Sequence, residues 1–245
     1  MAVNTELFDV VPPDTGSSIG FLAIVLLVVF GWLWAIARAA PEGRRNAALL
    51  RSSLGVGVWI GVSSGLVAAG IINPAHPVPA TPLLMLAVVG GAIRLGAGRL
   101  AANAAAAVPM GLLVGFQGFR LPLELVLHHW VEIGAAPSQM TWTGQNPDIV
   151  AGVVALAAAG FAGRNRKVAI AAQVIGLVLL VNVIRVAAFS VPGPIRQFTE
   201  LLLLPYNPMT VLIATVCVGG ALAAHVATLR RLFRPVATES TANRA

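Results

Sequence analysis

The sequence predicts an all-α fold, a polytopic transmembrane helical bundle of about seven spans. Hydrophobic residues make up 58% of the chain, charged residues only 10%, and the mean hydropathy is +0.86. Long apolar segments alternate with short loops, and every second loop is rich in arginine. A span needs about 20 apolar residues. The 245 residues therefore leave little room for a separate soluble domain.

The spans follow one another with short connections. The first three are expected at residues 19–40, 47–72 and 82–93, and the third is the weakest because its apolar run is the shortest. The last four are expected at residues 101–127, 147–163, 168–190 and 208–229. We therefore divide the chain into an outer N-terminal segment (1–18), a single transmembrane domain (19–234) and a cytoplasmic tail (235–245). The tail is polar, and we expect it to be disordered.

Arginine clusters predict the orientation of the bundle. Four segments carry them, at residues 38–51, 94–99, 164–167 and 230–234. Because basic residues concentrate on the cytoplasmic side of a membrane, the N-terminus is expected outside and the C-terminus in the cytoplasm. The net charge of +7 therefore reflects the basic residues expected on the cytoplasmic side of the membrane. It does not have the distribution of a nucleic-acid-binding surface, and we expect no nucleic-acid partner.

Small residues recur at intervals of four in two of the spans. The second span contains Gly57, Gly61 and Gly65, and the fifth contains Ala151, Ala155 and Ala159. Such stripes let helix backbones approach closely in lipid. Packing within the bundle is the first interpretation of both stripes. A homo-oligomer formed through the glycine stripe is the alternative.

A polar face on the fourth span marks a candidate site. Gln117, Arg120, Glu124 and His128 are spaced by three, four and four residues, which puts them on one side of a helix. Ionisable groups inside a membrane normally face the interior of the bundle or a wet cavity. Pro109 and Pro122 interrupt the same span and are expected to distort it.

Further polar residues are expected at a similar depth in the outer half of the membrane. They are Gln145, Asp148, Asn182 and Arg185. With Arg120 and Arg185 set against Glu124, the predicted pocket has a positive balance that suits an anion or a polar head group. We expect Glu124 to contact Arg185 as well as Arg120. Simpler roles remain open. They are a local Arg120–Glu124 pair, an Arg185 side chain that reaches the outer interface, and a helix start at residues 146–148, with Asn146 as the cap and Asp148 near the positive end of the helix.

Metal and cofactor sites are not expected. Adjacent histidines on a helix, His128 and His129, point in different directions and two arginines would repel a cation. The single cysteine, Cys217, excludes a disulfide within the chain and a cysteine-based zinc site. A retinal linkage would need a lysine in the last span, and Lys167 is the only lysine.

One stretch resembles a family of bacterial polytopic membrane proteins that has no known activity. The resemblance covers roughly residues 109–160 and is carried by the residues at 119–128, 139–142 and 144–146. It implies a bacterial origin. It assigns no role to any residue.

Three functions stay open from the sequence. The first is binding or translocation of a small polar or anionic compound through a pocket in the outer half of a bundle in the bacterial cytoplasmic membrane. The second is a membrane-embedded enzyme that uses Glu124 and His128 on an apolar or lipid-linked substrate. The third is a structural subunit of a membrane complex, and the expected partners are the lipid bilayer and a small anionic ligand or lipid head group.

Overall fold

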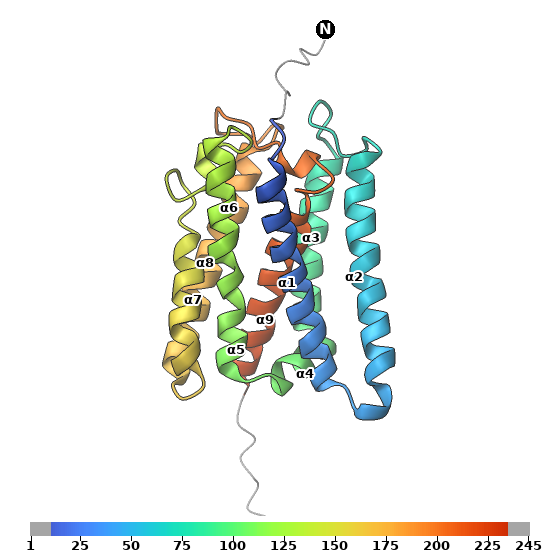
Figure 1. Cartoon of the computed structure of the whole chain (residues 1–245), viewed down its shortest axis with the longest axis vertical. Helices are drawn as coiled ribbons and strands as arrows, with labels where there is room; N and C mark the ends of the chain where they lie inside the picture. The colour runs from blue at the N-terminus through green and yellow to red at the C-terminus, as the bar shows by residue number, and fades with distance from the viewer. Residues whose placement is uncertain (1–10, 235–245) are drawn as a thin grey trace, which may run out of the picture.

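The computed structural model describes residues 11–234, and the predicted disordered tail at 235–245 lies outside them. Within the described residues the chain is helical and contains no strand, so the all-α prediction is confirmed. Figure 1 shows a bundle of upright helices, with the first described residues at one end and the last at the other.

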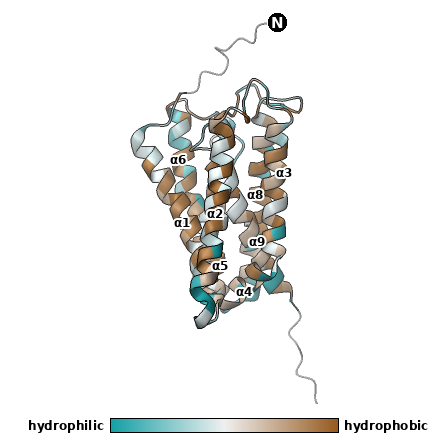
Figure 2. Cartoon of the chain, turned by 90° about the vertical axis from the view of Figure 1, so that its right-hand side faces the viewer, coloured by the Kyte–Doolittle hydropathy of each residue, from teal (hydrophilic) through white to brown (hydrophobic). Residues whose placement is uncertain are grey.

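Six helical segments are long and apolar enough to cross a membrane, which indicates a multi-pass membrane protein. Three of them are single helices at the start of the chain: α1 (Thr15–Ala39), α2 (Arg45–Ala68, preceded by a short 3-10 turn) and α3 (Ala80–Ala97). The fourth is composite and joins α5 (Met110–Gly115), a 3-10 segment (Phe116–Phe119) and α6 (Arg120–Glu132). The last two are α8 (Arg166–Ser190) and a π-helical turn (Ile213–Val218) continued by α9 (Gly219–Phe233). Brown, hydrophobic residues recur along these helices in Figure 2, and many large apolar side chains on them are exposed.

The fourth span differs from its predicted bounds of 101–127. Its first residues form a separate short helix, α4 (Arg99–Ala107), which lies across the lower end of the bundle in Figure 1. Val108 is extended (φ −99°, ψ 136°), as expected for a residue before proline, and the helix restarts after Pro109. Farther along, Pro122 lacks the N–H that would bond the carbonyl of Gly118, and the 3-10 segment lies at that point.

The predicted fifth span is short. Helix α7 (Ile149–Ala162) has 14 residues, a length of about 21 Å at 1.5 Å per residue, whereas the hydrocarbon core is about 30 Å thick. Figure 1 shows that α7 begins well below the upper end of the bundle, so the segment after α6 descends before the helix starts. This descent carries Asn146 and Asp148 into the protein, where both are buried.

The two stripes of small residues behave differently. On α7, Ala151 and Ala155 are buried, as close packing requires. On α2, a Cβ atom added to Gly57, Gly61 or Gly65 would meet nothing within 4 Å. The glycine stripe therefore faces away from the bundle, and the first interpretation of it, packing within the chain, is wrong.

Candidate functional site

A buried ion pair joins the start of α6 to the start of α7. The Arg120 guanidinium donates from Nε to Asp148 Oδ2 at 2.8 Å and from Nη2 to Asp148 Oδ1. The two side chains are only 2% and 8% exposed. Asp148 makes no side-chain capping bond to α7, although it occupies the cap position. The carboxylate therefore serves the arginine, and a role limited to the helix start, the simpler one left open for Asp148, does not describe it.

Glu124, one turn above Arg120, has no such counter-charge. It is 1% exposed, and its Oε1 accepts a hydrogen bond of 2.7 Å from Asn146 Nδ2. The same Asn146 nitrogen donates to the Met140 carbonyl at 3.0 Å. Within residues 11–234, neither Glu124 Oε2 nor Asn146 Oδ1 has a hydrogen-bond partner. Unpaired buried acceptors are costly, so these two oxygens mark a place where a donor or a cation would stabilise the protein.

A small cavity lies beside these groups. Its volume is about 30 Å³, and its polar lining comes from Arg120, Glu124, Asn146 and Asp148. The rest of the lining is apolar and includes residues of α8 and of the π-helical turn. A cavity needs about 10–15 Å³ to hold one water molecule. The site therefore has room for a proton, a small ion or a water molecule, and no room for an organic ligand.

The polar cluster continues below Arg120 on α8 and α9. Arg120 Nη1 donates to the Gly176 carbonyl at 2.8 Å and lies 3.5 Å from His225 Nε2. Because arginine only donates, this histidine nitrogen accepts, and Nδ1 donates to Gln173 Oε1 at 2.6 Å. Both His225 and Gln173 are buried. Asp148 thus binds Nε and Nη2 of the Arg120 guanidinium, while Gly176 and His225 contact Nη1.

Gln117 belongs to the same buried region. Its Nε2 donates to the Ala221 carbonyl at 3.1 Å, while its Oε1 has no partner. Four of the predicted site residues, Gln117, Arg120, Glu124 and Asp148, are thus brought into one buried cluster.

The other predicted residues lie apart from this cluster. Asn182 donates to the Gln145 carbonyl at 2.8 Å, and the exposed Arg185 donates to Asn182 Oδ1 at 2.9 Å. Among residues 11–234, Arg185 forms no ion pair with Glu124, so the contact expected between them is absent. Arg185 lies on the outer surface of α8 instead, because its neighbours Val183 and Val186 take the buried positions.

His128 is also separate from the cavity. Its ring is half-buried and stacks on Trp142, with the ring centroids 4.1 Å apart. Its Nε2 lies 3.7 Å from Glu132 Oε1 at the exposed end of α6. No hydrogen bond found among the described residues links it to Glu124.

These contacts change the charge balance inferred from the sequence. The buried cluster holds one arginine and two carboxyl groups, a formal charge of −1 with both acids ionised and His225 neutral. Arg120 is already held by Asp148, and Arg185 lies outside the cluster. The expected positive balance is therefore wrong, and the balance opposes an anion at this site. No group of three or more His, Cys, Asp or Glu side chains within residues 11–234 is placed to hold a metal ion.

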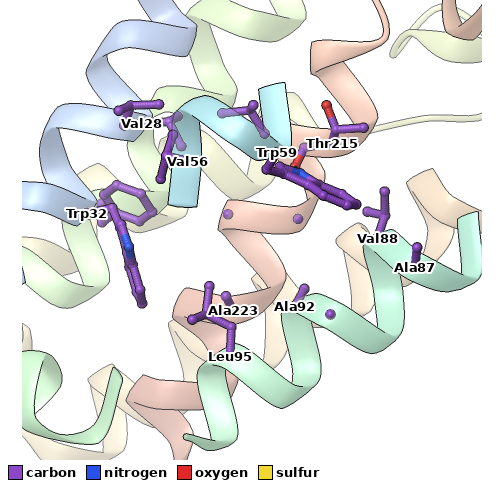
Figure 3. A pocket seen from close by; sticks show the side chains of 16 residues that line it. Val28, Trp32, Val56, Trp59, Ala87, Val88, Ala92, Leu95, Thr215 and Ala223 are labelled. Carbon is purple, nitrogen blue, oxygen red and sulfur yellow. The ribbon is translucent and has the colours of Figure 1, made fainter. Parts of the chain in front are cut away.

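A larger cavity lies on another side of the bundle. Figure 3 shows it between α1, α2, α3 and the last span, with a volume of about 250 Å³. Its lining is almost wholly apolar and includes Trp32 and Trp59. Trp59 Nε1 donates to the Thr215 carbonyl in the π-helical turn at 2.9 Å. This bond fixes α2 to the turn whose other side lines the Glu124 cavity.

The fold and the cluster define a multi-pass α-helical membrane protein with a charged site buried between its helices. Comparisons with known protein families, characterised proteins and solved structures find no match to this chain. The function must therefore be inferred from the site itself.

Three residues of the cluster were missed from the sequence. From the sequence Asn146 is expected only at the start of a helix, and no role is expected for Gln173 or His225. Polar residues within apolar runs normally face a bundle interior, and this signal could have identified Gln173 and His225. No comparable signal exists for Asn146, because its position depends on the path of the segment after α6.

Proposed function

We propose that this chain binds and translocates a small cation, a proton or an alkali metal ion, at Glu124. The observation that carries the proposal is a buried carboxyl group beside a small cavity. In the part of the chain that the structure describes, this group forms no ion pair and one of its oxygens has no hydrogen-bond partner. Leaving such a charge unpaired in a membrane is costly. Uptake of a proton or a small cation removes that cost.

The neighbouring groups support a cation over the small anionic compound expected from the sequence. Asn146 Oδ1 offers a second acceptor oxygen, and the Asp148 carboxylate neutralises the charge of Arg120. An anion would meet the uncompensated carboxylate, and the cavity is too small for an organic molecule. We therefore propose a cation as the ligand, in place of the small polar or anionic compound expected from the sequence.

The other two functions have weaker support. An enzyme that uses Glu124 and His128 as acid and base needs both groups at one substrate, whereas His128 stacks on Trp142. A purely structural subunit gives no reason for the unpaired oxygens of Gln117, Glu124 and Asn146.

Ion flux into proteoliposomes tests the proposal. Liposomes that contain the wild-type protein and an internal pH or Na⁺ indicator should dissipate an imposed gradient faster than empty liposomes. Glu124→Gln should abolish this flux, because the amide keeps the size of the side chain and removes its charge. Glu132→Gln is the matched control, since this carboxylate lies on the same helix with its side chain 63% exposed. Wild-type flux equal to that of empty liposomes would refute translocation.

We further propose the finer topology, with seven spans in a bacterial cytoplasmic membrane, the N-terminus outside and the C-terminus in the cytoplasm. The arginine clusters support it. So does the path of the described chain, which begins and ends at opposite ends of the bundle in Figure 1. In a Cys217→Ser background, a cysteine at Ser138 should react with an impermeant thiol reagent added to intact spheroplasts. A cysteine at Gly43 should not, and its labelling from outside would contradict the orientation.

A further inference from the structure

A third cavity, larger than the two described above, lies on the face of the bundle between α1 and α5. It has a volume of about 940 Å³ and is lined by residues of α1, α4, α5, α7 and α9. Sites for small organic ligands typically measure about 300–1,000 Å³. In Figure 1, α9 lies behind the space between α1 and α5, and α4 lies below it. The lining is apolar apart from Thr228 and the tryptophan ring nitrogens, as a site for hydrocarbon chains would be.

A basic cavity adjoins the lower end of this apolar one. It has a volume of about 420 Å³ and is lined by Trp34, Ala37, Arg38 and Arg45 at the turn between α1 and α2. Trp34 lines both cavities, so the two lie against the same side chain. Figure 2 shows hydrophilic residues gathered at this end of α2.

The two arginines carry charge that the described chain does not neutralise. Arg38 and Arg45 are exposed, and neither forms an ion pair within residues 11–234. Glu42 lies in the turn between them and is also exposed, without an ion pair to either. The Arg38 guanidinium lies 5.3 Å from the centre of the Trp34 ring, which directs it to the junction of the two cavities.

We propose that these two cavities together bind an anionic phospholipid, with its acyl chains in the apolar groove and its phosphate at Arg38 and Arg45. The positive charge of the two arginines and the apolar surroundings of the groove together indicate this ligand. A groove that opens on the apolar flank of a spanning bundle is in contact with hydrocarbon chains, and a basic pocket beside a spanning helix attracts anionic head groups. This site is distinct from the Glu124 cavity, whose lining comes mainly from α6, α8 and the π-helical turn and shares only Phe119 with the apolar groove.

Lipid retention measured by native mass spectrometry tests the proposal. Purified full-length protein is mixed with equal amounts of phosphatidylglycerol and phosphatidylcholine that carry the same acyl chains. The wild type should retain about ten times more of the anionic lipid, since a favourable contact from two arginines readily amounts to a tenfold preference. Glycerol phosphate, which has the head-group charge and no chains, should not displace it.

Two pairs of variants separate the two halves of the site. Arg38→Gln with Arg45→Gln should remove the preference for the anionic lipid. Arg44→Gln with Arg51→Gln is the matched control and should keep it, because these exposed arginines of the same region do not line the cavity. Ala35→Phe should lower the retention of both lipids by filling the apolar groove. The same change at the exposed Ala47 should not.

Four results would overturn the proposal. They are equal retention of the two lipids by the wild type, an unchanged preference after loss of Arg38 and Arg45, an equal loss in the Arg44 and Arg51 control, and displacement of the lipid by glycerol phosphate. The thermal melting temperature of each variant identifies any that fail to fold. The Ala35→Phe arm keeps the proposal testable if the arginine variant is among them.

Discussion

Arg120 and Asp148 are 28 positions apart in the sequence and form a buried, two-bonded ion pair that joins α6 to the start of α7. A short helix can begin inside the bundle because Arg120 neutralises the carboxylate of Asp148, the residue that precedes α7. The pair also leaves Glu124 without a counter-charge. The proposed cation site depends on this division of roles between the two carboxyl groups.

Breaking the pair should destabilise the protein strongly. Arg120→Gln or Asp148→Asn leaves one charge buried and unpaired, so each should lower the free energy of unfolding by about 3–5 kcal/mol. Removing both charges with Arg120→Met and Asp148→Leu should cost less than either single change. Unfolding in mixed micelles measures all three variants, and Arg164→Gln, at an exposed arginine, serves as the control. Additive effects in the double variant would show that the pair is not coupled.

Gly176 should not tolerate a side chain. An added Cβ atom would lie 2.8 Å from His225 Cε1 and 3.2 Å from His225 Nε2, so Gly176→Ala should displace the imidazole from Arg120. Overpacking of this kind costs about 1–3 kcal/mol. The melting temperature in detergent should fall for Gly176→Ala and stay nearly constant for Gly160→Ala, because an added Cβ at Gly160 meets nothing within 4 Å. Equal effects at both glycines would contradict the tight contact.

Asp14, which lies just before α1, should make stability depend on pH. Its side chain accepts hydrogen bonds from the hydroxyl and the backbone N–H of Ser17, and it contacts His129 Nε2 at 2.8 Å. These bonds lower the pKa of the Asp14 carboxyl, the hydroxyl bond contributing most. A carboxyl group with a lowered pKa stabilises the fold above its ordinary pKa and loses that effect as pH falls through the lowered one.

The wild type should therefore melt at a higher temperature than Asp14→Asn at neutral pH, and the difference should shrink as the pH falls below the ordinary value of 3.8. Melting curves of both proteins across this range provide the measurement. A difference that is constant with pH would show that the charge of Asp14 does not act through these bonds.

The outward glycine stripe of α2 should support self-association. Gly57, Gly61 and Gly65 leave the surface of this helix open, and small residues at this spacing let two helices approach closely in lipid. Energy transfer between labelled copies in vesicles should fall to the level of a monomer for Gly61→Leu. Gly90→Leu on α3, which also meets open space, should leave it unchanged. Loss of energy transfer in both variants, or in neither, would argue against self-association through this glycine stripe.

The sequence predicted the helical class and the approximate position of most spans, because apolar length and arginine placement depend on the membrane alone. It predicted the polar face of α6 for the same reason. It did not predict that Asp148, and not Arg185, would meet this face. That pairing depends on the descent of the segment after α6, and neither periodicity nor hydropathy describes such a path. The resulting change of charge balance turned an expected anion site into a proposed cation site.

The protonation of Glu124, measured by infrared spectroscopy, tests the central claim most directly. Difference spectra of the wild type should show a carboxylic acid band that disappears when the pH is raised or when Na⁺ is added. The band should be missing in Glu124→Gln and retained in Glu132→Gln. The same band with the same response in Glu124→Gln would contradict the claim that Glu124 is the group that exchanges a cation.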